Sequence, residues 1–162
     1  MTEERNPMRP GEVALAFDPA ERAEAGITFI GRLRTPWKKG DCPRNLRKAR
    51  ERGGAFSVEL DPAYRDGLTG LEPGQAIILL YWMNQARRDL IVQTPGHADG
   101  PRGTFALRSP VRPNPVSLAT VRITALELEE GRISVDALDC FDGTPLVDIK
   151  PWRDTIDVPP TS

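Results

Sequence analysis

Residues 102–118, RGTFALRSPVRPNPVSL, contain three prolines within six positions. Each proline fixes φ, removes a backbone donor and disfavours a helical conformation in the residue before it. An α-helix cannot pass through this proline-rich segment, which is therefore predicted to be a stiff, extended or turning connection. It carries Arg102, Arg108 and Arg112. A rigid carrier lowers the entropy that is lost when a side chain binds a ligand, so the segment is a candidate binding element.

The composition favours a single β-rich domain. A chain of 162 residues is long enough to bury a core, and its 16 prolines and 14 glycines argue against a helical bundle and for short strands joined by turns. No apolar run exceeds about eight residues, whereas a membrane helix needs about 20. No basic and apolar signal segment opens the chain. We therefore expect a cytoplasmic protein with no membrane partner.

The cysteines and the histidine predict no metal centre. Cys42 and Cys140 are too few for a disulfide scaffold and lack metal-ligand spacing, so reduced thiols and no bound metal are expected. His97 is the sole histidine and lies among prolines and glycines. A solvated histidine is favoured over a general base there.

Positive charge is concentrated in one part of the chain. Residues 32–52 contain nine basic and two acidic residues, a local sum of +7 against a total of −1. Residues 45–52, followed by two glycines, are predicted to form the one short helix. This basic helix is either a solvated face or a surface that docks on a polyanion, and the one-sided charge keeps both interpretations open.

Apolar patterns predict the strands of a small antiparallel β-barrel, so the fold class is all-β. Residues 75–83 form the most apolar run and are expected to be a central strand that is covered on both faces. The alternating apolar residues are at odd-numbered positions up to Ala125 and at even-numbered positions after it, and this change predicts a β-bulge. We expect a flexible extension or an appended strand at 1–26, the barrel at 27–152 and an extended tail at 153–162. The predicted strands are 27–33, 55–60, 75–83, 90–94, 118–128 and 133–137.

No G-x-G-x-x-G turn follows a strand, and strands and helices do not alternate, which excludes a dinucleotide-type sheet. Three ordered blocks instead resemble the TrmO family, also called TsaA-like or YaeB-like. The blocks are RSPVRPNP at 108–115, LDCFDGTPLVDIKP at 138–151, and IGRLRTPWK at 30–38 followed by PRN at 43–45. The resemblance implies a β-barrel, homodimeric, S-adenosylmethionine-dependent methyltransferase. Its members act on N6 of the threonylcarbamoyl-adenosine beside the anticodon of tRNA.

The resemblance also implies the residues of a cofactor site. This chain departs from the family pattern at Asn45, where Gln is usual, at Asn84, where His is usual, at Val111, where an aromatic residue or His is common, and at Ser117, where Gly is usual. The implied cofactor-binding residues are Pro43, Arg44, Asn45, Asn84, Gln85, Arg108, Leu118, Asp139, Cys140, Phe141 and Asp142.

The residues themselves support part of this assignment. Asp139 and Asp142 lie three apart in the acidic loop, residues 138–143, where carboxylates can accept hydrogen bonds from a ribose or an amino group. The alternative is ordinary turn chemistry. Arg108 and Arg112 have no acidic neighbour between residues 100 and 126. We expect Arg108 and Asp139 to converge on the cofactor.

For the substrate we expect tRNA. Trp37 and Trp82 are better explained as core residues than as stacking partners of a base. The candidate tRNA-binding residues are Arg47, Lys48, Arg50, Arg87, Arg88 and Arg112. Two alternatives remain: a methyltransferase of the same fold with another substrate, and a barrel that binds cofactor or RNA without catalysis. No catalytic base is assigned.

Overall fold

The computed structural model describes residues 7–161. Contacts divide the chain into two compact units. Unit 1 combines residues 1–26 with residues 83–116, and unit 2 combines residues 27–82 with residues 117–162.

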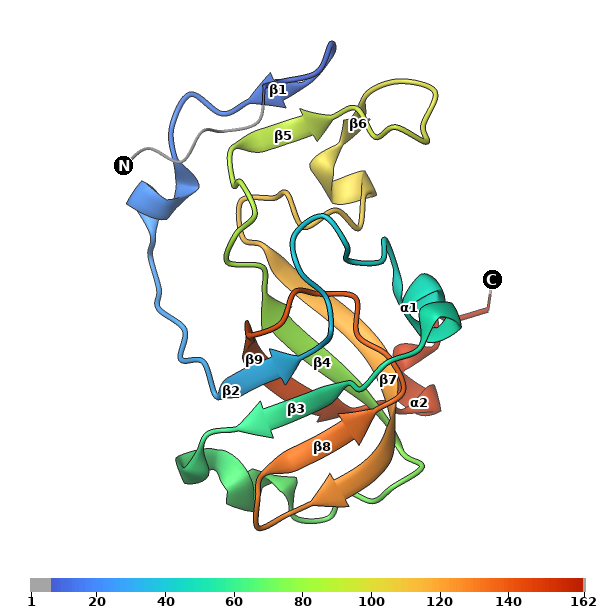
Figure 1. Cartoon of the computed structure of the whole chain (residues 1–162). Coiled ribbons are helices and arrows are strands. Elements are labelled where there is room, and N and C mark those ends of the chain that lie inside the picture. The colour runs from blue at the N-terminus through green and yellow to red at the C-terminus, as the bar shows by residue number, and fades with distance from the viewer. Residues whose placement is uncertain (1–6, 162) are drawn as a thin grey trace. The chain divides into compact units, whose positions relative to one another are not determined.

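Unit 2 is a closed β-barrel with strand order β2-β3-β8-β7-β4-β9, and each of its recorded pairings is antiparallel. The predicted all-β barrel is confirmed (Figure 1). The strands are β2 Gly31–Arg34, β3 Ser57–Leu60, β4 Ala76–Trp82, β7 Val116–Glu127, β8 Arg132–Val135 and β9 Thr144–Pro151. The helices of this unit are α1 Leu46–Arg52, the 3-10 helix η2 Pro62–Leu68 and α2 Asp154–Asp157.

The barrel interior is filled by alternate residues of its strands. Leu33 on β2, Val58 on β3 and Ile133 on β8 are fully buried. On β7, Val121 and Ile123 point inward. The register with β8 then shifts between Ile123 and Ala125, so β7 is irregular as predicted, but the shift precedes the predicted position after Ala125, and Ala125 is exposed.

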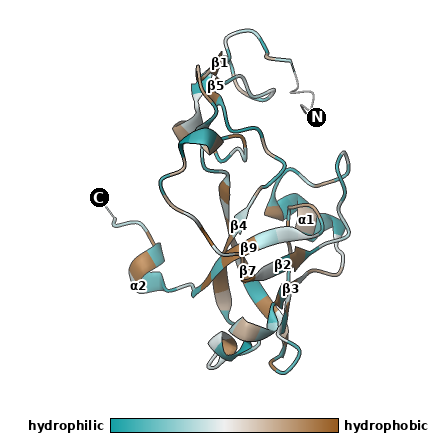
Figure 2. Ribbon diagram, turned by 90° about the vertical axis from the view of Figure 1, so that its left-hand side faces the viewer, coloured by the Kyte–Doolittle hydropathy of each residue, from teal (hydrophilic) through white to brown (hydrophobic). Residues whose placement is uncertain are grey.

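Strand β4 is covered on both faces near its start. Ile77, Ile78 and Leu79 are consecutive and all buried, as the continuous apolar run predicted. Consecutive strand residues point to opposite faces, so both faces of β4 exclude water here. Figure 2 shows this strand as largely hydrophobic.

The first predicted strand begins later than expected. Residues 27–30 precede β2, which starts at Gly31, and Ile27 is exposed. A Cβ at Gly31 would collide with the carbonyl oxygen of Glu59. Glycine therefore permits the close approach of β2 and β3 where the barrel strand begins.

Unit 1 contains a three-stranded sheet with strand order β1-β5-β6. Val13 of β1 pairs with Val92 of β5, so part of the 1–26 segment is an added strand, one of the two alternatives expected from the sequence. The flexibility predicted for this segment stays a prediction, and residues 1–6 lie outside the described residues. The elements are β1 Val13–Ala14, the 3-10 helix η1 Pro19–Arg22, β5 Leu90–Gln93, β6 Arg102–Gly103 and the 3-10 helix η3 Thr104–Ala106.

The domain boundaries drawn from the sequence also stay a prediction. The predicted tail, 153–162, includes the short helix α2. No helix among residues 7–161 has the length and apolar character that crossing a membrane requires.

Candidate functional site

The acidic loop is held in place by side chains of the segment that follows β2. The indole Nε1 of Trp37 donates to the carbonyl of Leu138 at 2.7 Å. The hydroxyl of Thr35 donates to the carbonyl of Cys140 at 2.8 Å. The carbonyls of the residues before and after Asp139 are therefore both fixed. These bonds also fix the direction in which the side chain of Asp139 points.

The rest of the loop is bonded in the same way. The amide of Asp142 donates to Trp37, and the amide of Gly143 donates to Leu33, at 3.0 and 2.9 Å. The amide of Thr35 donates to the carboxylate of Asp142 at 3.2 Å. These bonds join the loop to β2 and to the segment that follows it, about 100 positions away in sequence, so the loop conformation depends on the closed barrel.

A tyrosine without a predicted role holds the carboxylate of Asp139. The hydroxyl of Tyr81, buried on β4, donates to Oδ1 of Asp139 at 3.1 Å. Burial, and then the negative charge of Asp139, raises the pKa of the Tyr81 phenol. The phenol therefore stays protonated and acts as a donor. On an apolar strand this tyrosine is indistinguishable by pattern from a core residue, and no sequence signal could have found it.

Cys42 lies within the electrostatic reach of Asp139. Burial, and next the charge of Asp139, raises the pKa of the Cys42 thiol to about 11. Pro43, which follows, is buried, and Arg44 is exposed. The charge of Asp139 thus acts on Cys42, and the cofactor contacts implied for Pro43 and Arg44 stay predictions. Burial raises the pKa of Cys140 to about 12, so this thiol is a core group.

Asn45 has a structural use that explains its identity. Its side-chain oxygen accepts from the amide of Lys48 at 2.9 Å and caps the N-terminus of α1. Asparagine is among the best N-cap residues, and its short side chain suits this contact better than the longer glutamine of the family. The predicted helix 45–52 included Asn45, whereas α1 begins one residue later, at Leu46.

The basic residues of α1 are paired on the surface. Arg47 and Lys48 both contact Glu51, at 3.2 and 2.7 Å. Arg50 contacts Asp136 at 2.6 Å. Surface ion pairs contribute about 0–1 kcal/mol, so these side chains can exchange their partners for phosphates at little cost.

The remaining predicted residues of unit 2 differ in exposure. Leu118 on β7 is 43% exposed. Phe141 is half-buried, and Asp142 is exposed and lies 3.7 Å from Arg34.

In unit 1, two of the predicted arginines brace the backbone and a third forms an ion pair. Arg112 donates to the carbonyls of Leu107 and Ser109 at 3.1 and 2.9 Å, and Arg88 donates to that of Pro113 at 2.6 Å. Arg87 forms a two-pronged ion pair with the buried Asp89. The tRNA contacts predicted for these arginines stay predictions, and their observed contacts give each one a structural role.

Asn84, Gln85 and Arg108 are exposed residues of unit 1. Asn84 and Gln85 lie in the turn after β4 that the amide of Ala86 closes on Met83 at 2.9 Å. Since Arg108 and Asp139 belong to different units, their convergence stays a prediction.

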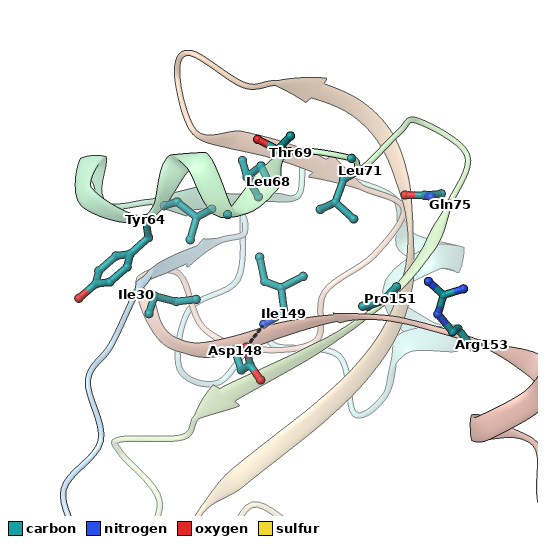
Figure 3. Close-up of a pocket in the computed structure, with 13 residues that line it drawn as sticks. Ile30, Tyr64, Leu68, Thr69, Leu71, Gln75, Asp148, Ile149, Pro151 and Arg153 are labelled. Atoms are coloured by element: carbon teal, nitrogen blue, oxygen red, sulfur yellow. Dashed lines mark hydrogen bonds between the residues drawn. The ribbon is translucent and has the colours of Figure 1, made fainter.

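The pocket of unit 2 lies at the other end of β2 from the acidic loop. Ile30, directly before the strand, lines it, whereas Thr35, directly after the strand, holds the loop. Its volume is about 460 Å³, and Figure 3 shows Leu68, Leu71 and Ile149 along its apolar wall. None of the cofactor-binding or tRNA-binding residues predicted from the sequence lines this pocket. Within residues 7–161, no three acidic, histidine or cysteine side chains gather closely enough to bind a metal ion.

Comparisons with known proteins identify the family. The model of the tRNA-methyltransferase O N-terminal domain matches residues 32–158. The probable S-adenosyl-L-methionine-binding protein VirR of Rhizobium radiobacter is 37% identical over 147 residues, which cover 90% of this chain and 80% of VirR. An S-adenosyl-L-methionine-binding protein of Archaeoglobus fulgidus is 40% identical over 129 residues, which cover 79% of this chain and 89% of the relative.

A solved structure of a TrmO protein has a similar fold. The crystal structure of TrmO from Pseudomonas aeruginosa matches with a TM-score of 0.65 and 28% identity, over 86% of this chain and 61% of that one. The chain thus spans about three fifths of the length of this solved structure. With most of its length matched by the family model, and with the barrel and the pinned acidic loop in place, this chain belongs to the TrmO family defined by the tRNA-methyltransferase O N-terminal domain.

Proposed function

We propose that this protein is an S-adenosylmethionine-dependent tRNA methyltransferase that modifies N6 of the threonylcarbamoyl-adenosine next to the anticodon. Family membership supports the reaction class, and the names of the relatives support the cofactor. The observation that carries the proposal is the pinned acidic loop, in which Tyr81 holds the carboxylate of Asp139.

The residues of the loop fit the proposed cofactor. S-adenosylmethionine has a ribose diol and an ammonium group, and both are donors that a carboxylate can accept. Asp139 is half-buried, which strengthens a hydrogen bond relative to one in open water. An ionised carboxylate offers about four acceptor positions, so the bond from Tyr81 does not exhaust it. We assign to Asp139 the binding of a hydroxyl or amino group of the cofactor.

Two other proposed cofactor residues carry a positive charge, opposite to that of Asp139. Arg44 and Arg108 are exposed guanidinium groups, which can grip the carboxylate end of the cofactor. Asn84, Gln85 and Leu118 complete the proposed set, together with Pro43, Asn45 and the loop residues Cys140, Phe141 and Asp142. When bound, the cofactor supplies an electrophilic methyl group on a sulfonium.

The protein contributes mainly alignment to the reaction. A ureido-type nitrogen can attack an aligned methyl group and lose its proton late, so no side chain is required as a strong base. Tyr81 is unsuited to that task because its pKa is raised. Holding both reactants in line accounts for the catalysis proposed for this site.

For tRNA we propose α1 as a phosphate-binding surface. Its basic residues are exposed. Arg47 and Lys48 pair with Glu51 on the surface, and Arg50 pairs with Asp136 and donates to the carbonyl of Thr120. Replacing Arg47, Lys48 and Arg50 with alanine should reduce the slope of log Kd against log salt by about 0.7–0.9 for each phosphate that is no longer neutralised. An unchanged slope would mean that tRNA binds to another surface of the protein.

A second candidate function is methylation of another substrate by the same fold. The observation that favours it is Asn84, an exposed turn residue where the family has histidine. The change alters both the charge and the hydrogen-bonding groups that a substrate meets.

The test begins with isothermal titration of the protein with S-adenosylmethionine. Transfer of labelled methyl groups to tRNA with and without the threonylcarbamoyl modification then separates the candidates. Transfer only to modified tRNA supports the proposal, whereas transfer to unmodified tRNA supports the second candidate. Binding of cofactor without any transfer would indicate a non-catalytic barrel. Light scattering of the same sample tests the proposed homodimer.

A further inference from the structure

Phe105 is the most exposed large hydrophobic side chain of residues 7–161, with 78% of its surface accessible. It lies on η3, the single 3-10 turn at the start of the proline-rich segment. The sequence assigned it no role. An aromatic ring so fully exposed contributes little to the fold of unit 1.

The turn that presents Phe105 is rigid. Thr104 is fully buried, and its hydroxyl donates to the carbonyl of Leu90 at 2.9 Å. Gln93, also buried, donates from Nε2 to Thr104 at 2.8 Å and to the carbonyl of Val111 at 2.7 Å. The amide of Leu107 closes the turn on Thr104 at 3.1 Å. Phe105 is therefore held outward by a buried network, and binding a partner would cost little conformational entropy.

The charges around Phe105 select the chemistry of that partner. Arg102 and Arg108 lie three residues to either side and are both exposed. No acidic residue occurs between positions 100 and 126. An aromatic face flanked by cations is the combination that binds single-stranded nucleic acid, because the ring stacks on a base while the cations contact phosphates.

A protein partner fits this surface less well. A protein interface needs a contiguous apolar area, but the ring is flanked by the small Ala106 and the half-buried Leu107. A second copy that presented the same patch would bring like charges together at Arg102 and Arg108. Charge complementarity favours a polyanion.

We propose that Phe105 is a stacking platform for an unpaired base of the anticodon loop, with Arg102 on the adjoining phosphate. This inference rests on the proposed function and adds a substrate contact to it. Phe105 is three residues from Arg108, and three residues span at most about 10 Å. A base on Phe105 therefore lies close to any group that Arg108 binds.

The test measures the binding of a labelled anticodon stem-loop RNA, with a fully paired RNA of equal length as the reference ligand. Phe105→Ala should weaken stem-loop binding about tenfold or more, because base stacking on an aromatic ring has that magnitude. Phe105→Trp should restore binding, and Phe105→Leu should not. Binding of the paired RNA should stay unchanged in all three variants. Arg102→Ala should weaken both ligands and reduce the salt slope.

Matched controls separate stacking from folding. Leu128→Ala removes another exposed apolar side chain, 48% accessible, in the turn after β7 and should change neither ligand. The melting temperature of Phe105→Ala should equal that of the wild type.

Three outcomes overturn the inference: equal stem-loop binding by Phe105→Ala, full rescue by Phe105→Leu, or a loss of self-association in Phe105→Ala, which would make a second copy the partner. A wild type that binds the stem-loop through Phe105 but transfers no methyl group supports the inference and overturns the proposed activity.

Discussion

The acidic loop and the proline-rich segment are both stiff, but for different reasons. The loop is held by Thr35 and Trp37, about 100 residues away in sequence. The proline-rich segment is held by its own prolines, by Arg112, which donates to carbonyls three and five residues away, and by Gln93 and Arg88, which donate to Val111 and Pro113. Conformation in the first region therefore depends on closure of the barrel, whereas in the second it depends on the prolines and on bonds that span at most 25 residues of sequence. Changes to the two regions should act on different properties.

The largest effect is expected at the carboxylate of the acidic loop. Asp139→Ala removes an ionised acceptor and should weaken binding of S-adenosylmethionine about 100-fold, since hydrogen bonds to charged groups contribute about 1.5–3 kcal/mol. Isothermal titration measures this loss. Asp148→Ala is the control, because Asp148 lines the pocket at the other end of β2 and pairs with Lys150 on the surface. Equal losses in both variants would mean that the acidic loop has no special role.

The pKa of Cys42 reports on the charge of the same loop. Burial and the charge of Asp139 raise the pKa of this thiol from 9.0 to about 11, so we expect a thiolate fraction at pH 8 about 100-fold lower than for an ordinary cysteine. Alkylation by iodoacetamide should be correspondingly slow and should accelerate as the pH rises toward 11. Asp139→Asn should move the midpoint downward but keep it above 9.0, because burial is the larger cause. A midpoint that does not move would show that Asp139 is uncharged or distant.

The anchors of the loop should matter for stability. Thr35→Val leaves the buried carbonyl of Cys140 and the amide of Trp37 without this partner, which should cost about 2 kcal/mol. For a chain of this size we expect a fall in melting temperature of about 4–8 °C. Thr124→Val, an exposed position on β7, is the matched control and should change little. If Thr35→Val leaves the melting temperature unchanged, the loop keeps its conformation without the barrel.

The comparison also explains what the sequence could predict. Strand alternation at Val121 and Ile123 and the glycine after Arg52 are local signals, and both strand β7 and the end of α1 were confirmed. Burial of Trp37 was expected as well. The donor role of its indole was not, because the acceptor at Leu138 is 101 residues away.

For the arginines, the charge pattern failed to predict contacts that the structure shows. Counting charges suggested that Arg112 lacked a local partner, but its partners are carbonyls of Leu107 and Ser109, which carry no formal charge. Charge patterns report only ionised partners, so arginines that brace the backbone are missed. The TrmO resemblance supplied what local patterns lacked for the acidic loop, because its residues are recognisable only as a family motif.

A smaller effect is expected at the phenol that positions Asp139. Tyr81→Phe keeps the buried ring but removes the donor at 3.1 Å. Cofactor affinity should fall about fivefold, in line with a net hydrogen-bond contribution of about 1 kcal/mol. The transfer rate with saturating cofactor should be retained if Tyr81 acts only through Asp139. In the background of Asp139→Ala the substitution should have no further effect on affinity, and an additive loss would contradict positioning.

The smallest effect is expected in the proline-rich segment. Pro113→Ala keeps the carbonyl that accepts from Arg88 at 2.6 Å and mainly frees the unfolded chain, so stability should fall by only about 0.4–1 kcal/mol. Chemical denaturation measures this difference against Thr35→Val. Because Thr104 and Gln93 hold the turn that presents Phe105, stem-loop RNA affinity should stay close to that of the wild type. A destabilisation as large as that of Thr35→Val would show that tertiary contacts, and not the prolines, hold this segment, and the contrast between the two regions would disappear.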